Sequence, residues 1–343
     1  MARTFLLAVC LLARAPLWAQ GPEAQRLSAE TAFGAVPLPP AARLASRLKL
    51  EPPGPPRTCP GGLDFSGVTW PASLTAEDRQ ALQLALNISG SFEGGQGWAN
   101  ITGNFDGQGV SLGLLNQNLG QGSLQQMLRR LHRERPEVLA ALVSEAHLKS
   151  LLAMLEAWQL AEGIEAAPGP LSTFDEPTER FLILAAAANQ ASVAWARANL
   201  YSGAHFEPTW KSELVALAAS PAYVSLQIAA ALELHDKALV YERLIEVREL
   251  RSYLMLFDVN VQNGGLYPED LVEYDAYLQI NRGASSAAKL EKLLVLRLRH
   301  VRTRFIEDVR SRKLAIIRGV GKVHGQRRDL PAQYCYDGAW PYR

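Results

Sequence analysis

The sequence is poor in cysteine and has no excess of charge of either sign. Its 343 residues include 3 cysteines, and 35 basic residues nearly balance 34 acidic ones. A formal net charge of +1 gives no electrostatic case for binding nucleic acid. Cysteine and histidine never combine with the spacing of a zinc site, so we expect neither a metal nor another cofactor.

The apolar run near the start of the sequence is too short to span a bilayer. It extends from Phe5 to Leu12, follows the positive Arg3, and precedes a Leu17-Trp18-Ala19 end that suggests cleavage after Ala19 or Gln20. This pattern predicts a secretory signal over residues 1–20, with a retained membrane anchor as the alternative. We therefore expect an exported protein, periplasmic or extracellular, with no integral membrane segment in the mature chain.

Residues 21–62 lack apolar periodicity and are rich in proline. Such a segment favours extended, loosely ordered backbone, which predicts an arm or linker and leaves 63–343 as the folded domain. Cleavage of the signal would leave Cys59 in the arm and Cys335 near the end of the chain. In an oxidising compartment these two are expected to form one disulfide; two unrelated free thiols are the alternative.

Charge is almost absent between Arg79 and Arg129, where Glu93 and Asp106 are the only charged residues. Nine of the 34 residues from Ser91 to Leu124 are glycine, which favours turns and short strands over a long helix. Two isolated carboxyl groups on a polar surface suit glycosidic hydrolysis, because one protonates the leaving oxygen and the other activates water or attacks the sugar. The alternative is that both are ordinary turn residues, since Asp-Gly is a common turn dipeptide.

A helix is predicted over residues 75–91, just before the first of these carboxyl groups. Thr75 is a candidate N-cap with Asp78 three residues on, and an apolar stripe follows. Gly90 is typical of a helix end. Glu93 is therefore expected in the last turn of this helix or just past it.

The second carboxyl group falls in a predicted β-hairpin. Residues 98–112 favour two short strands joined by a turn near 103–109, and Asp106 lies in that turn. Ser123, with a glutamine three residues later, begins another helix. The order of elements is thus a helix, a glutamate, a hairpin with an aspartate, and a helix.

This order is similar to that of the lysozyme-like superfamily, and within it the chain resembles the chitosanases of glycoside hydrolase family 46. Those enzymes carry an acid glutamate at a helix end and a base aspartate in a motif D-G-x-G-[YF]-T-x-G, which residues 106–113 resemble. The resemblance implies that Glu93 is the general acid, Asp106 the general base, and Ser111 a hydroxyl that helps to hold the attacking water. Gln108 stands where those enzymes usually carry an arginine.

Six polar or aromatic side chains are the substrate-binding candidates: Trp98, Gln108, Gln117, Asn118, Asn260 and Gln262. Trp98 offers a stacking surface, although core packing is the alternative for a tryptophan beside a helix. Gln117 and Asn118 can hydrogen-bond sugar hydroxyl or acetamide groups. Residues 257–265 predict a polar loop similar to the segment that chitosanase-like enzymes place opposite the hairpin; a helix end followed by a solvated turn is the alternative.

The remainder of the chain predicts helices at 123–135, 136–161, 178–201, 208–219, 221–235, 237–257, 268–280 and 285–317. The expected fold is mainly α, a lysozyme-like α+β fold in which two helical lobes and a small β-hairpin line a cleft. Glu93 and the hairpin would form one wall of that cleft.

The expected function is hydrolysis of a β-1,4-linked amino-sugar polymer, either peptidoglycan, chitosan or a chitin-like chain, with inversion at the anomeric carbon. A polysaccharide is therefore the expected partner. A chitosan cleft should be strongly acidic because its substrate is polycationic, so the nearly uncharged stretch favours peptidoglycan or an acetylated polymer. The alternative is an exported peptidoglycan-binding protein with this fold and no catalysis.

Overall fold

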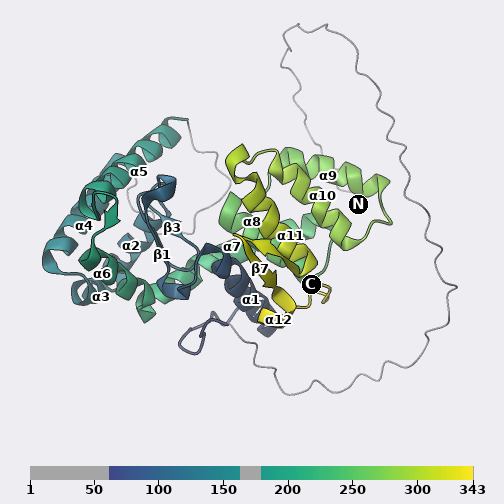
Figure 1. Ribbon diagram of the computed structural model, residues 1–343, viewed down its shortest axis with the longest axis horizontal. Coiled ribbons are helices and arrows are strands. Elements are labelled where there is room, and N and C mark those ends of the chain that lie inside the picture. Colours follow the sequence, from purple (N-terminus) through teal and green to yellow (C-terminus); the bar gives the residue numbers. More distant parts are fainter. Residues whose placement is uncertain (1–61, 163–178, 343) are drawn as a thin grey trace, which may run out of the picture. The chain divides into compact units, whose positions relative to one another are not determined.

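The computed structural model describes residues 62–162 and 179–342, and in these ranges helices predominate over short strands (Figure 1). The mainly α fold expected from the sequence is confirmed. The predicted signal, nearly all of the proline-rich arm and Cys59 lie outside the described residues, so the Cys59–Cys335 disulfide stays a prediction.

One hydrophobic core surrounds a small antiparallel sheet (Figure 1). The sheet consists of β1 (Ile101–Thr102), β2 (Ser111–Leu112) and β3 (Gln117–Asn118). The helices of this core are α2 (Ser123–Glu134), α3 (Pro136–Leu142), α4 (Glu145–Glu162), α5 (Glu179–Asn199) and α6 (Pro208–Ala219). A hairpin of β4 (Tyr201–Ser202) and β5 (His205–Phe206) joins α5 to α6.

A second core is built from the first helix and the C-terminal third of the chain. Its elements are α1 (Ala76–Glu93), α8 (Leu250–Asn263), α9 (Pro268–Ile280), α10 (Ser286–Leu298), α11 (Ile306–Arg318), the hairpin of β6 (Val320–Val323) and β7 (Gln326–Asp329), and α12 (Leu330–Tyr334). The long helix α7 (Pro221–Ile245) contributes Tyr223 and Leu226 to the first core and Ile228 and Ala231 to the second. The two helical lobes therefore share α7.

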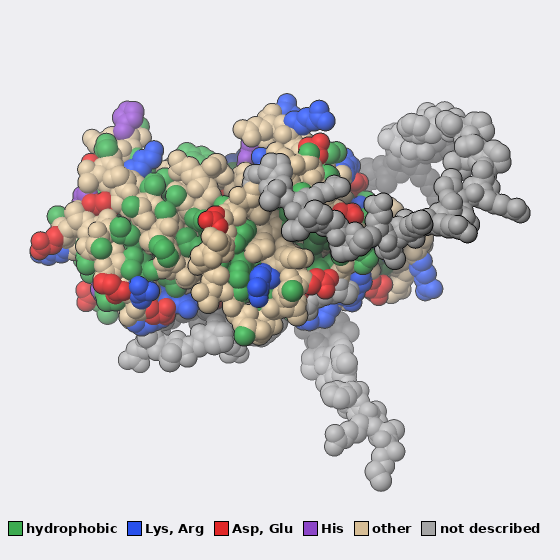
Figure 2. Space-filling model, turned by 90° about the horizontal axis from the view of Figure 1, so that it is seen from below, with side chains coloured by type: hydrophobic (Ala, Val, Ile, Leu, Met, Phe, Trp, Pro, Cys, Tyr) green, Lys and Arg blue, Asp and Glu red, His purple; other side chains and the backbone are tan. Residues whose placement is uncertain are grey.

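The surface carries both signs of charge. On the face shown in Figure 2, acidic and basic side chains are interspersed and do not gather into a field of one sign, as a formal net charge of +1 leads one to expect. Among the described residues, no single helix is both long and apolar enough to cross a membrane; α6 and α7, which meet at 66°, pass that test only together as a bent pair.

Helix α1 begins where its local sequence predicts but ends later. Thr75 Oγ1 accepts a hydrogen bond from the Asp78 N–H at 3.0 Å, which satisfies one of the free donors of the first turn. The helix continues three residues beyond Gly90 and ends at Glu93, so the glycine serves packing and does not end the helix. A Cβ at Gly90 would lie 2.3 Å from a methyl carbon of the buried Leu114 side chain.

The predicted hairpin is a three-stranded sheet. Ile101 pairs with Leu112, and Ser111 pairs with Asn118. Sequence analysis missed β3 because glutamine and asparagine have low strand propensity, whereas here the ladder to β2 holds them extended. The connection between β1 and β2 contains a short 3-10 helix, η2 (Asn104–Asp106), which ends at Gly107 with a φ of 84°.

Several helix boundaries differ from the prediction. Residues 237–257 are not one helix, because α7 ends at Ile245 and Glu246 turns the chain with a φ of 56° before α8 begins. Most of the predicted loop at 257–265 is consequently the last part of α8, which ends where Gly264 takes a left-handed φ of 74°. The predicted helices 136–161 and 285–317 are each split, the first into α3 and α4 and the second into α10, η3 (Thr303–Phe305) and α11.

The close approach at Gly90 gives a stability prediction. Gly90→Ala should lower the free energy of unfolding by roughly 1–2 kcal/mol, because overpacking against Leu114 outweighs the better helix propensity of alanine. Gly67→Ala is the control, since a Cβ there meets nothing within 4 Å. Denaturant unfolding of both variants measures the difference; equal stabilities would show that Leu114 moves aside freely.

Candidate active site

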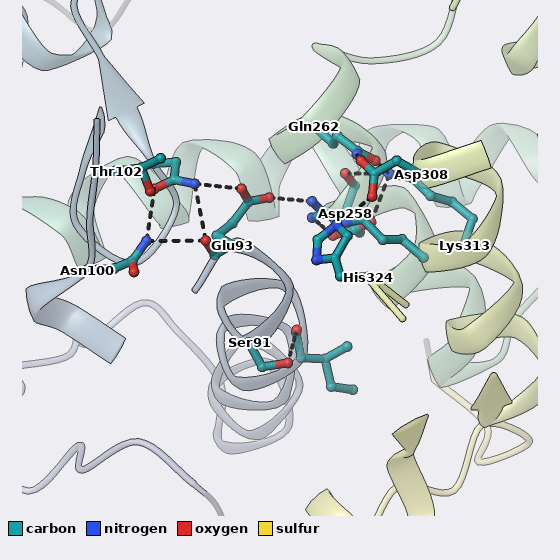
Figure 3. Close-up of polar contacts among 12 residues, drawn as sticks. Ser91, Glu93, Asn100, Thr102, Asp258, Gln262, Asp308, Lys313 and His324 are labelled. Atoms are coloured by element: carbon teal, nitrogen blue, oxygen red, sulfur yellow. Dashed lines mark hydrogen bonds and ion pairs between the residues drawn. The ribbon is translucent and has the colours of Figure 1, made fainter. Parts of the chain in front are cut away.

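Glu93 is the last residue of α1, and its side chain is 15% exposed. Asn116 Nδ2 donates a hydrogen bond to Glu93 Oε2 at 2.8 Å, and Arg312 Nη1 donates to Oε1 at 2.5 Å. Figure 3 shows Glu93 between Asn100 on one side and Asp258 on the other. Each carboxylate oxygen therefore has a donor, one neutral and one charged, and the two donors fix the orientation of the group.

The turn that supplies Asn116 is bound to the end of α1 by a second amide. Asn116 lies between β2 and β3 with a φ of 51°, a left-handed conformation in which asparagine is common. Asn100 Nδ2 donates to Asn116 Oδ1 at 2.9 Å and to the Glu93 backbone carbonyl at 3.3 Å. Gly94 follows Glu93 because a Cβ there would lie 1.9 Å from Asn100 Oδ1.

On its other side, Glu93 belongs to a buried group of four charges (Figure 3). The Arg312 side chain, on α11, is 2% exposed, and its Nη2 lies 2.6 Å from Asp258 Oδ1, on α8. Lys313 Nζ lies 2.8 Å from Asp258 Oδ2. Buried ions persist when each is paired, and two carboxylates here balance two cations.

The pKa values in this group follow from burial and pairing. Burial alone would raise the pKa of Asp258, but the charges of Arg312 and Lys313 more than offset it and hold that pKa well below its usual range. Burial lowers the pKa of Lys313 to about 8, against the opposing pull of Asp258. Asp258 is therefore an ionised anchor for both cations.

The polar network extends from Lys313 to the β6–β7 hairpin (Figure 3). Lys313 Nζ donates to Gln262 Oε1, and Gln262 Nε2 donates to Asp308 Oδ2 at 2.6 Å. Asp308 Oδ1 in turn lies 2.5 Å from Nε2 of His324, at the hairpin turn. Both halves of the Gln262 amide are thus engaged within the protein, and its predicted role in substrate binding stays a prediction.

A cavity of about 470 Å³ opens beside Glu93. The end of α1 forms one part of its wall and the β6–β7 hairpin another. The polar or aromatic side chains in its lining include Ser91, Glu93, His324, Gln326, Arg328 and Tyr334. Glu93 is thus an oriented carboxyl group in the lining of a cavity.

Asp106 lies at a different place, in the exposed connection between β1 and β2. Its Oδ1 accepts a hydrogen bond from the Gln108 N–H at 3.1 Å. Burial raises the pKa of Tyr201 to about 12, and the charge of Asp106 acts in the same direction. Tyr201 and Phe105 line a second cavity of about 690 Å³, and neither of these two cavities is lined by both Glu93 and Asp106.

The other candidates of the hairpin lie in or near the sheet. Ser111 is buried on β2, the central strand, opposite both neighbouring strands. The buried Asn118 Nδ2 donates to the Asn116 carbonyl at 3.3 Å, so Asn118 supports the turn that holds Glu93. The side-chain oxygens of Gln108 and Gln117 are buried and have no hydrogen-bond partner among the described residues.

The two remaining candidates are engaged in packing. Trp98 packs edge-to-face against Phe65 at 5.8 Å between ring centroids, and its Nε1 donates to the Asp64 carbonyl at 3.4 Å. This contact favours the packing role that sequence analysis kept as an alternative. Asn260 is buried on α8, where its Nδ2 donates to the Leu234 carbonyl at 3.3 Å.

Three residues of the site were not predicted from the sequence: Asn116 and Arg312, which contact Glu93, and Asp258, which pairs with Arg312. Asp258 did carry a signal, because a lone carboxylate within the apolar run L-M-L-F-D-V of a helix is rarely buried without a partner. Its partner carried none, since Arg312 is one of many basic residues in α11. Among the described residues, no group of three or more Cys, His, Asp or Glu side chains is placed to hold a metal ion.

No protein-family model and no curated protein matches the chain. Among solved structures, it is similar to native chitosanase from Bacillus subtilis MY002, with 14% identity, a TM-score of 0.43, and coverage of 72% of this chain and 88% of that one. It is also similar to a GH46 chitosanase from Gynuella sunshinyii solved with chitotetraose, with 19% identity, a TM-score of 0.42, and coverage of 76% and 99%.

The buried charges give a second stability prediction. Asp258→Asn should lower the free energy of unfolding by about 3–5 kcal/mol, because it leaves Arg312 and Lys313 buried with one carboxylate fewer. Glu291→Gln is the matched control: it breaks an exposed pair with Arg318 and should cost at most about 1 kcal/mol. Denaturant titration of the two variants tests this; a similar small loss in both would mean that water reaches the buried cations.

Proposed function

We propose that this protein is an exported glycoside hydrolase that cleaves a β-1,4-linked amino-sugar polymer, with Glu93 as the general acid and Asp106 as the general base. The observation that carries the proposal is the position of Glu93. It is a carboxyl group at a helix end and beside a cavity, held between the Asn116 amide and the Arg312 guanidinium. Export depends on residues 1–20, which lie outside the described residues.

In this mechanism the protonated form of Glu93, in which Asp258 remains the ion-pair partner of Arg312, gives its proton to the glycosidic oxygen as the bond to the anomeric carbon breaks. The carboxylate that remains is stabilised by hydrogen bonds from Arg312 and Asn116 at the moment when its charge develops. Arg312 is itself held by Asp258, so the donor is in place before the reaction and little reorganisation is required.

Asp106 would supply the second carboxylate of the pair. Its loop is shaped by the left-handed Gly107 and by the hydrogen bond from the Gln108 N–H, and Asp106 is exposed. An exposed carboxylate in a loop suits activation of a water molecule better than direct attack on the sugar. Ser111, on the strand that follows the loop, is proposed to help to orient that water.

The proposal predicts a large kinetic effect at Glu93. Glu93→Gln should preserve the fold and lower turnover by at least ~10²-fold, the scale of a general-acid contribution. Zymograms against cell-wall, chitin and chitosan substrates, followed by rates on the substrate that is cleaved, provide the measurement. Glu134→Gln is the matched control, because Glu134 is exposed on α2 and pairs with its neighbours Arg130 and Arg133.

Two outcomes would contradict this assignment. Near wild-type turnover in Glu93→Gln would remove Glu93 from the reaction. Binding of a polymer by wild type and variant alike, with cleavage by neither, would instead favour the peptidoglycan-binding alternative.

The assignment of Asp106 predicts inversion at the anomeric carbon. A base that acts through water stands about 6.5–9.5 Å from the acid, whereas a nucleophile stands about 5–5.5 Å from it. From a β-linked polymer, proton NMR of the first-formed product should show the α-anomer. An initial β-anomer would mean retention, and Asp106 would lose its role as the water-activating base.

A further inference from the structure

The β6–β7 hairpin presents one of its two faces to the cavity beside Glu93. Residues directly opposite in an antiparallel pair lie on the same face, and successive residues alternate. Val323 is opposite Gln326, and Gly321 is opposite Arg328. Val323, Gln326 and Arg328 line the cavity. The hairpin therefore directs Arg328 to the same cavity as the proposed general acid.

Arg328 is a buried cation without a carboxylate partner among the described residues. It is 9% exposed, and its one hydrogen bond there runs from Nη2 to Ser91 Oγ. Its guanidinium carbon lies 5.2 Å from the centroid of the Phe92 ring, and its Nε is buried with no hydrogen-bond partner. Ser91 is already fixed, since its hydroxyl donates to the Ile88 carbonyl at 2.7 Å.

Arg312, beside the same Phe92 ring, has the carboxylate partners that Arg328 lacks among the described residues. The guanidinium carbon of Arg312 also lies 5.2 Å from the Phe92 centroid, but Arg312 has both Glu93 and Asp258 as ion-pair partners. A buried charge is costly unless it is paired, and the planar guanidinium fork matches a carboxylate. Arg328 is thus an arginine directed at a cavity without the anion that its chemistry requires.

We propose that Arg328 binds a carboxylate carried by the sugar polymer, so that the substrate cleaved at Glu93 is an anionic amino-sugar polymer and not chitosan. This inference rests on the proposed function. The carboxylate has two possible sources with one chemistry: the lactyl ether of a muramic acid residue, or a uronic acid within the chain. Chitosan is polycationic, and its ammonium groups would be repelled by Arg328.

The charge of the hairpin supports an anionic ligand. On the other face, Lys322 and Arg327 are exposed and directly opposite each other, so they add a diffuse positive potential to the hairpin. The carboxylate of the neighbouring Asp329 accepts a hydrogen bond from the Ala332 N–H at the start of α12. The chain as a whole has a net charge of +1, so this excess of cations is local to the hairpin.

Calorimetric binding to the full chain tests the inference. The probes are four tetrasaccharides: one of alternating N-acetylglucosamine and N-acetylmuramic acid with free lactyl carboxylates, a hyaluronan tetramer with uronic acids, a neutral chitin tetramer, and a glucosamine tetramer. Titrations use Glu93→Gln protein, so that cleavage does not consume the ligand. At least one anionic tetramer should bind ~10-fold or more tightly than the chitin tetramer, the scale of a hydrogen bond to a charged group.

The variants separate a specific site from general electrostatics. Arg328→Gln should remove the preference for the anionic tetramer, and Arg328→Lys should retain part of it, which also shows that the fold tolerates a change at this position. Arg327→Gln is the matched control, because Arg327 is the exposed neighbour on the opposite face. It should lower the affinity by less than ~2-fold.

The anionic tetramer that depends on Arg328 identifies the source of the carboxylate. Tightest binding of the glucosamine tetramer, an unchanged preference in Arg328→Gln, or an equal loss in Arg327→Gln would each overturn the inference. Arg328-dependent binding by a protein that cleaves none of the polymers would contradict the proposed hydrolase function and support the anion site. Glu93-dependent cleavage of chitosan that is unchanged in Arg328→Gln would support the hydrolase function and contradict the anion site.

Discussion

The buried guanidinium of Arg312 is the interaction on which the candidate site depends. It extends from α11 and pairs at once with Glu93 at the end of α1 and with Asp258 on α8. Removing these charges from water costs several kcal/mol per ion, which only close pairing offsets. Three helices are therefore held together at the point where Glu93 meets the cavity, and the orientation of its carboxyl group follows from the packing of the second core.

The part of the site that the sequence predicted is the part determined by neighbours along the chain. Thr75 begins α1, an apolar stripe buries it, and Glu93 falls in its last turn. Arg312 could not be found in this way because it is 219 positions from Glu93, and periodicity reports only local structure. For the same reason the third strand was missed, since its residues are extended because of pairing with β2 and not because of their own preference.

The helix boundaries show the same limit. Proline as the first residue of α6, α7 and α9 marked their starts correctly, because proline is favoured in the first helical turn. The end of α7 has no such residue: Glu246 takes a left-handed φ of 56°, which glutamate rarely adopts. This boundary error also affected the predicted site. Asn260 and Gln262 were expected in a loop and are instead fixed on α8 by contacts within the protein.

Two arginines, Arg312 and Arg328, contact the Phe92 ring, and they have different roles beside Glu93. Contact with an aromatic ring is worth about 0.5–2 kcal/mol, and one hydrogen bond from a charged donor about 1.5–3 kcal/mol. Neither the Phe92 ring nor the Ser91 hydroxyl supplies a negative charge, so both leave the Arg328 cation without a counter-ion. Arg312 has two carboxylates and becomes part of the framework. Arg328 has none among the described residues, and a cation in that condition at a cavity wall is complementary to an anionic ligand.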